Sequence, residues 1–94
     1  MLDDFGGKVA VITGAGSGFG REFSRFAQRL GMRLVLADIQ ADALEETAAE
    51  MRGAGADVVA ERIDVSVGSD VERLARRARE AFGRTDLLFN NAGV

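Results

Sequence analysis

Short apolar runs alternate with segments of helical periodicity along the chain. We expect strands at residues 8–13, 33–38, 57–63 and 86–90, and the first of them is a short continuous apolar run of the kind buried on both faces. Between them, apolar residues recur every three to four positions at 19–30, 41–52 and 69–82, which is typical of amphipathic helices. The alternation β-α-β-α-β-α-β predicts a parallel sheet with right-handed crossovers and therefore an α/β fold.

The predicted helices carry apolar faces and end at glycines. The apolar face of the first helix comprises Phe19, Phe23, Phe26, Ala27 and Leu30. That of the second comprises Leu44, Ala48 and Met51, and that of the third Val71, Leu74, Ala75, Ala78 and Phe82. Gly31 follows the first helix, Gly53 and Gly55 follow the second, and Gly83 follows the third, positions at which glycine commonly ends a helix. Ser69 and Glu72 have the spacing of a capping box, which predicts Ser69 as the N-cap of the third helix.

The strand order follows if the third helix crosses to the opposite face of the sheet. The order is then 3-2-1-4, and it reverses between the first and fourth strands. Ligands of such doubly wound folds bind at this reversal, outside the carboxyl ends of the strands. The turns at residues 13–20 and 90–93 both open there. We therefore predict a Rossmann-type doubly wound parallel sheet, in which residues 1–94 form a single domain.

The turn after the first strand is rich in glycine. Residues 13–20 have the sequence TGAGSGFG, so the spacing is T-G-x-x-x-G-x-G rather than G-x-G-x-x-G. A strand that leads through such a turn into a helix leaves backbone N–H groups without an internal partner. Those groups and the helix dipole suit an anionic pyrophosphate. The alternative is a flexible glycine loop with no ligand.

Together with N-N-A-G at residues 90–93, this spacing resembles the short-chain dehydrogenase/reductase family over essentially the whole chain. The resemblance implies a cofactor site made of Thr13, Gly14, Gly16, Ser17, Gly18, Phe19, Gly20, Asp38, Ile39, Asp64, Val65, Asn91, Ala92 and Gly93. It also implies that the Thr13 hydroxyl is tied to the N-N-A-G segment, which otherwise would be a plain turn. At Phe19 the family prefers a smaller aliphatic residue, so the floor of the nicotinamide pocket would differ here.

Asp38 ends the second strand, 20 residues after Gly18. A carboxylate there can accept hydrogen bonds from both hydroxyls of the adenosine ribose. It also repels the 2′-phosphate of NADP, by about 4 kcal/mol at 4 Å as an upper-end figure. NADP-dependent relatives usually carry a base at one of the flanking positions, which are Ser17 and Ile39 here. The sequence therefore predicts NAD rather than NADP; the alternative is that Asp38 is the N-cap of the next helix.

Asp64 and Val65 end the third strand. The resemblance assigns this pair to the adenine ring, with the carboxylate toward the exocyclic amine. The alternative is that Asp64 is an ordinary turn residue at the end of a strand.

Composition excludes several classes of function. A formal net charge of −3 and a pI of about 4.9 argue against nucleic-acid binding. The arginines at positions 73, 76, 77 and 79 are flanked by Glu72 and Glu80, which favours a solvated helix face with local charge pairs over a basic patch. The chain contains no cysteine and no histidine, so it lacks disulfides and the commonest metal ligands. The first residues are acidic and carry no apolar run of the secretory type, and no apolar run in the sequence approaches the length of a membrane span, so we expect a cytoplasmic protein with no membrane partner.

The chemistry of the resembled family uses a tyrosine, a lysine four residues later and a serine. This chain has no tyrosine, and its only lysine, Lys8, begins the first strand. No residue is therefore assigned a catalytic role. We expect the NAD-binding N-terminal part of an oxidoreductase acting on an alcohol or carbonyl substrate, cut after the fourth strand and inactive alone. The alternatives are a non-catalytic dinucleotide-binding module and a half-domain that pairs with a partner.

The fourth strand lies at the edge of the predicted sheet. Leu87, Leu88 and Phe89 have no later strand beside them in this sequence, and an open edge invites pairing with another chain. We expect part of this sheet face to be bare and the chain to self-associate or to be marginally stable.

Overall fold

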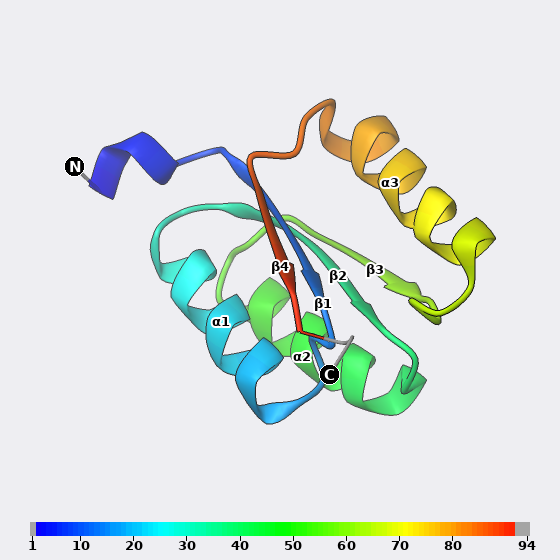
Figure 1. Cartoon of the computed structure of the whole chain (residues 1–94). Helices are drawn as coiled ribbons and strands as arrows, with labels where there is room; N and C mark the ends of the chain where they lie inside the picture. Colours follow the sequence, from blue (N-terminus) through cyan, green and yellow to red (C-terminus); the bar gives the residue numbers. More distant parts are fainter. Residues whose placement is uncertain (1, 92–94) are drawn as a thin grey trace.

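The structure is a computed structural model and describes residues 2–91. It contains the strands β1 (Val9–Thr13), β2 (Arg33–Asp38), β3 (Val58–Arg62) and β4 (Leu87–Asn90) and the helices α1 (Gly18–Arg29), α2 (Ala41–Gly53) and α3 (Gly68–Phe82), preceded by a 3-10 turn at Leu2–Phe5. The strands form one parallel sheet in the order β3-β2-β1-β4 (Figure 1). The predicted Rossmann-type α/β fold and strand order are confirmed.

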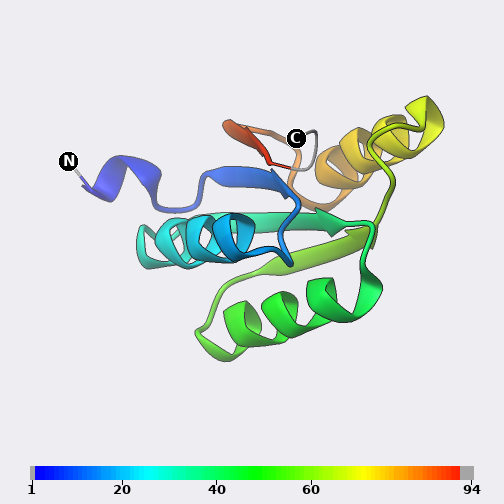
Figure 2. The ribbon, with the colours of Figure 1, turned by 60° about the horizontal axis from the view of Figure 1, so that its bottom comes forward.

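Two apolar layers hold the helices on opposite faces of the sheet (Figure 2). Alternate side chains of each strand point to opposite faces, so β1 and β2 contribute to both layers. The layer beneath α1 and α2 is built from Ala10, Ile12, Ala27, Leu34, Leu36, Leu44, Ala48 and Met51. The layer beneath α3 is built from Val9, Val11, Val35, Ala37, Ile63, Leu74 and Ala78. The third helix therefore crosses to the opposite face, as the strand order requires.

The strand register brings the three polar turns to the same edge of the sheet. Thr13, the last residue of β1, pairs with Ala37 of β2 and with Asn90 of β4. The residues that follow these partners are Asp38 and Asn91. The glycine turn, the carboxylate and the asparagine segment thus leave the sheet side by side.

The buried face of α1 differs from the predicted one. Its buried residues are Gly20, Ser24 and Ala27, whereas Phe19 and Phe26 are 79% and 50% exposed. At Gly20 the helix passes so close to the glycine turn that a Cβ would overlap the backbone of Gly14. The ring of Phe23 instead stacks on that of Phe89 in β4, with 4.2 Å between the ring centroids. Gly31 follows the helix with φ of +81°, as predicted.

The predicted capping box of α3 is wrong. The helix begins at Gly68 with Val67 at the N-cap position, and no side chain caps it. Ser69 lies within the first turn because the amides of Asp70 and Val71 already bond to the Val67 carbonyl. Gly83 ends the helix in a left-handed conformation, as predicted.

The strand β4 has one bare side. Leu87 and Phe89 are half-buried against the α1 layer, but Leu88 is 62% exposed on the α3 side. Val71 of α3, beside it, is also exposed. The predicted exposure of this sheet face is therefore confirmed among residues 2–91. Within the same residues, no helix has both the length and the apolar character needed to cross a membrane.

Candidate functional site

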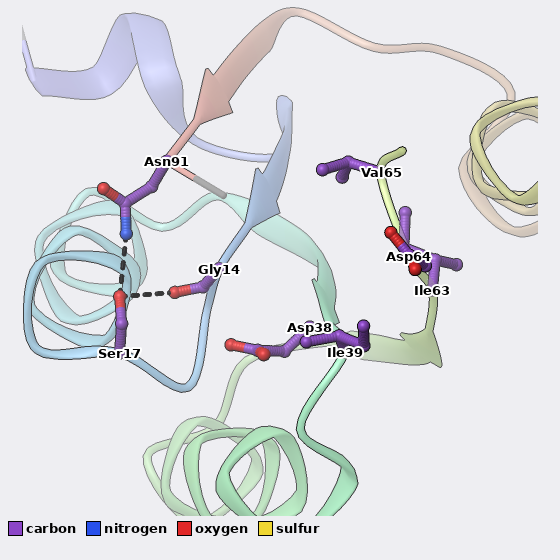
Figure 3. Close-up of a pocket in the computed structure, with 8 residues that line it drawn as sticks. All are labelled: Gly14, Ser17, Asp38, Ile39, Ile63, Asp64, Val65 and Asn91. Carbon is purple, nitrogen blue, oxygen red and sulfur yellow. Dashed lines mark hydrogen bonds between the residues drawn. The ribbon is translucent and has the colours of Figure 1, made fainter. Parts of the chain in front are cut away.

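A cavity of about 290 Å³ opens at the carboxyl ends of the strands (Figure 3). Its walls are formed by Gly14, Ser17, Asp38, Ile39, Ile63, Asp64, Val65 and Asn91. All of these except Ile63 belong to the predicted site. In Figure 3 the glycine turn and Asn91 form one side of the cavity, and the segment from Ile63 to Val65 faces them across it.

Ser17 ties three segments together. Its hydroxyl donates to the Gly14 carbonyl at 2.7 Å and accepts the Gly20 amide at 3.2 Å, which makes Ser17 the N-cap of α1. It also accepts a hydrogen bond from Nδ2 of Asn91 at 2.7 Å, from beyond the end of β4 (Figure 3). The glycine turn is therefore a bonded structure rather than a free loop.

The glycines of the turn differ in what they leave room for. A Cβ at Gly20 would overlap the backbone of Gly14, and one at Gly16 would lie 2.6 Å from Cβ of Ala43 on α2. These two positions require glycine so that the chain can pack against itself. A Cβ at Gly18 would meet no atom within 4 Å. The space in front of Gly18 is therefore open to a molecule from outside.

Two backbone amides at the start of α1 have no hydrogen-bond acceptor among the described residues. The amides of Ala15, Gly16 and Ser17 bond to the Ala37 carbonyl, the Asp38 carboxylate and the Gly14 carbonyl. The Gly20 amide is capped by Ser17, whereas no bond is formed by the amides of Gly18 and Phe19. Unpaired amides at a helix N-terminus bind anions. The turn thus presents two donors beside the open space at Gly18.

Asp38 faces the cavity with its carboxylate held on both sides. Oδ2 accepts the Gly16 amide at 2.8 Å, and Oδ1 accepts the Gln40 amide at 2.9 Å. The N-cap of α2 is Gln40, so the alternative that Asp38 caps this helix is wrong. Each carboxylate oxygen can accept a further hydrogen bond, and Asp38 therefore supplies fixed acceptors on the cavity wall.

Asp64 forms a turn of its own on the opposite wall. Its Oδ1 accepts the amide and the hydroxyl of Ser66 at 2.9 and 2.6 Å. These bonds, the hydroxyl first, hold the pKa of Asp64 below its usual value, so the carboxylate is ionised at neutral pH. The Asp64 amide donates to Asp70 of α3 at 2.9 Å. The turn role of Asp64 is confirmed, and the same carboxylate lines the cavity.

The predicted tie between β1 and the asparagine segment is present. The Thr13 hydroxyl donates to Oδ1 of Asn90 at 2.8 Å and accepts the Asn91 amide at 3.1 Å. Ala92 and Gly93, which were also predicted for the site, lie outside the described residues.

The remaining predicted residues shape the turn without lining the cavity. Gly16, Gly18 and Gly20 act through the backbone, as described above. The side chain of Phe19 lies away from the cavity wall and is largely exposed. The prediction missed Ile63, whose side chain is buried with the α3 layer. In the sequence it is one more apolar residue of a strand, so no local signal marks it.

The fold and the cavity together define a Rossmann-type protein with a cavity outside the carboxyl ends of its strands, where doubly wound folds bind their ligands. Residues 8–94 match the family profile described as short chain dehydrogenase. The chain belongs to the short-chain dehydrogenase/reductase family.

Relatives with assigned names agree with this membership. The chain is 41% identical over 93 residues to "CLA biosynthesis dehydrogenase/reductase" of Lactiplantibacillus plantarum, covering 99% of this chain and 32% of that protein. It is 44% identical over 87 residues to "1-deoxy-11-beta-hydroxypentalenate dehydrogenase" of Streptomyces exfoliatus, covering 93% and 32%. The chain thus spans about a third of the length of the curated relatives it matches.

A solved structure of the family resembles the chain closely. It is a short chain dehydrogenase/reductase from Burkholderia phymatum in complex with NAD, with a TM-score of 0.89 and 56% sequence identity. The match covers 94% of this chain and 31% of that one.

Proposed function

We propose that the cavity binds NAD and that this chain is the cofactor-binding part of an oxidoreductase acting on an alcohol or carbonyl substrate. The observation that carries the proposal is the pair of unpartnered amides, of Gly18 and Phe19, beside a cavity lined by Asp38. The amides and the dipole of α1 suit a pyrophosphate. The fixed oxygens of Asp38 suit the two hydroxyls of the adjoining ribose. Bound NAD supplies the nicotinamide that exchanges hydride with the substrate.

Asp38 also favours NAD over NADP in this proposal. A 2′-phosphate on the ribose would lie against a carboxylate, and the repulsion at 4 Å is on the order of 4 kcal/mol for a surface-like dielectric. The residues that line the described cavity include no lysine or arginine to offset it. The Burkholderia phymatum relative was solved with NAD. The adenine ring is assigned to Asp64 and Val65 on the opposite wall.

The proposed contribution of these residues is binding and orientation, without proton transfer. The sequence has no tyrosine. Its only lysine, Lys8, precedes β1 and so lies at the opposite end of the sheet from the cavity. The partial character of the domain and a cytoplasmic location remain predictions.

Titration calorimetry with NAD and NADP tests the binding. We expect heat of binding with NAD, much weaker binding with NADP, and a smaller difference between the two cofactors after Asp38→Asn. No heat with NAD at millimolar concentration would contradict the proposal. The alternative is a non-catalytic binding module. Such a module would bind NAD, but the full-length protein that contains it would produce no NADH from alcohols.

We also propose that β4 pairs with a second copy of the chain. Leu88 is exposed on β4, which lies at the edge of the sheet among the described strands. Open edges of this kind pair with other strands. Sedimentation velocity at increasing concentration should show association that Leu88→Lys weakens, because a charge at the strand edge opposes pairing. A monomer at every concentration would contradict this part.

A further inference from the structure

A buried hydroxyl on α2 touches the glycine turn from behind. Thr47 has no exposed surface, and its Oγ1 donates to the Ala15 carbonyl at 3.0 Å. The carbonyl of Ala43, one turn back in α2, lies farther away at 3.3 Å. Because a hydroxyl has one proton, the shorter contact to Ala15 is the better donor bond.

The same hydroxyl accepts a hydrogen bond from the far end of the turn. Nε of Arg21, the residue after Gly20, donates to Thr47 Oγ1 at 2.9 Å. The guanidinium also contacts the Ala43 carbonyl at 3.4 Å and the Glu46 carboxylate at 3.2 Å. One oxygen atom on α2 is therefore bonded to the chain both before and after the unpartnered amides of Gly18 and Phe19.

We propose that Thr47 is a positioning residue for the cofactor. By holding the Ala15 carbonyl and the Arg21 side chain at once, it fixes the separation of the two ends of the glycine turn. That separation sets the direction in which the Gly18 and Phe19 amides point. The inference rests on the proposed function, since it assigns to Thr47 an effect on the binding of NAD by these amides.

The remaining anchors of the turn separate this role from simple folding. The Ala15 amide bonds to the Ala37 carbonyl, and the Gly16 amide bonds to Asp38, so β2 holds the turn without help from α2. Valine has nearly the shape of threonine, and Thr47→Val therefore keeps the packing of α2. It removes only the polar link. Arg21 then keeps only its contacts with the Ala43 carbonyl and Glu46, so the start of α1 is held less firmly against α2.

The experiment compares three variants by NAD titration and thermal melting. Thr47→Val removes the hydroxyl, and Thr47→Ser restores it. Met51→Val is the matched control, because Met51 is buried one turn further along α2 and belongs to the apolar layer beneath α1 and α2. We expect Thr47→Val to raise the Kd for NAD about five- to tenfold, the effect of losing one buried hydrogen bond. Thr47→Ser and Met51→Val should bind within about twofold of the original protein, while Met51→Val lowers the melting temperature.

Hydrogen exchange of the Gly18 and Phe19 amides in the NAD complex gives a second measure. These amides should exchange faster in Thr47→Val than in Met51→Val. An unchanged Kd in Thr47→Val, or an equal rise in Met51→Val, would overturn the positioning role and leave NAD binding standing. If the unmodified protein binds no NAD, the proposed function and the positioning role both fail. Failure of the positioning role alone is therefore distinguished by NAD binding that persists in the unmodified protein.

Discussion

The strands β2 and β4 both pair in parallel with β1, but they differ in how they are covered. From Leu34 to Asp38 every residue of β2 is buried, between α1 and α2 on one face and α3 on the other. Residues of β4 alternate between half-buried and exposed. The cavity lies at the carboxyl ends of the strands, where Asp38 of β2 and Asn91, the residue after β4, both line it. Its two sides therefore rest on parts of the fold with unequal packing.

The two strands also differ in the hydrogen bonds that hold the residues around the cavity. On the β2 side, the turn is fixed by backbone and side-chain bonds that involve Ala15, Gly16 and Thr47. On the β4 side, the ties to β1 are polar: Thr13 with Asn90, and the Val9 amide with Asp86 at 2.8 Å. A strand that buries little apolar surface owes a larger share of its stability to hydrogen bonds. We therefore expect the side-chain hydrogen bonds between β4 and β1 to supply a larger share of the stability of β4 than hydrogen bonds supply for β2.

The largest effect is expected from truncating the same residue type on the two strands. Leu36→Ala in β2 removes a side chain with no exposed surface and should lower the free energy of unfolding by about 3 kcal/mol. Leu88→Ala in β4 should lower it by less than about 0.5 kcal/mol, because Leu88 is mostly exposed. Urea unfolding of both variants, at a concentration where association is absent, measures the difference. Equal losses would mean that β4 is as well packed as β2.

A comparison of two glycines in the turn should give the next largest effect. Gly20→Ala places a methyl group against the Gly14 backbone and should cost about 2 to 3 kcal/mol of stability, because the turn must open to accept it. Gly18→Ala meets no protein atom and should change stability by less than about 0.5 kcal/mol. The Gly18 variant should nevertheless bind NAD more weakly. Thermal melts and NAD titration separate the two variants; tight NAD binding by Gly18→Ala would show that this space is not used.

Removing the hydroxyl that joins β1 to β4 should have an intermediate effect. Thr13→Val takes away the partner of the Asn90 side chain and of the Asn91 amide. We expect a loss of about 1 to 2 kcal/mol, as for other buried hydrogen bonds. Thr13→Ser, which keeps the hydroxyl, is the control. Exchange of β4 amides should accelerate more than exchange of β2 amides, and uniform acceleration would argue against a separate weakness of β4.

The smallest effect concerns acid. The Arg84 side chain, and then the Val9 amide, hold the pKa of Asp86 below its ordinary value of 3.8. A carboxyl whose pKa is lower in the folded state stabilises the fold above its ordinary pKa and loses that contribution as the pH falls through the folded value. Asp86→Asn should therefore lower the melting temperature at about pH 6 and have less effect at about pH 3. A difference that does not change with pH would assign the effect to packing.

The sequence was sufficient for the fold because its signals are local. Four short apolar runs and three helical segments predicted the strand order, and the resemblance to the short-chain dehydrogenase/reductase family implied most of the cavity wall. The errors occurred where tertiary packing decides. The apolar stripe of α1 suggested burial of Phe19 and Phe26, but the helix buries the face that carries Gly20, Ser24 and Ala27. The helix α3 begins at Gly68, one residue before Ser69, so Ser69 is not its N-cap.

The contacts of Thr47 could not be found in this way. It lies 32 residues from Ala15 and 26 from Arg21, and in the sequence it is one polar residue among the alanines and glutamates of α2. Only the packing of α2 against the turn turns its hydroxyl inward.

The hydroxyl of Ser17 has a consequence for how the molecule responds to ligands. It accepts hydrogen bonds from the Gly20 amide at the start of α1 and from the side chain of Asn91 after β4, so the two segments share one hydrogen-bond acceptor. If binding at one segment changes the affinity at the other, the coupling free energy is the same in both directions. Whatever change in affinity a ligand at the first turn of α1 causes for binding at the end of β4, binding there must cause the same change, by the same factor, for that ligand.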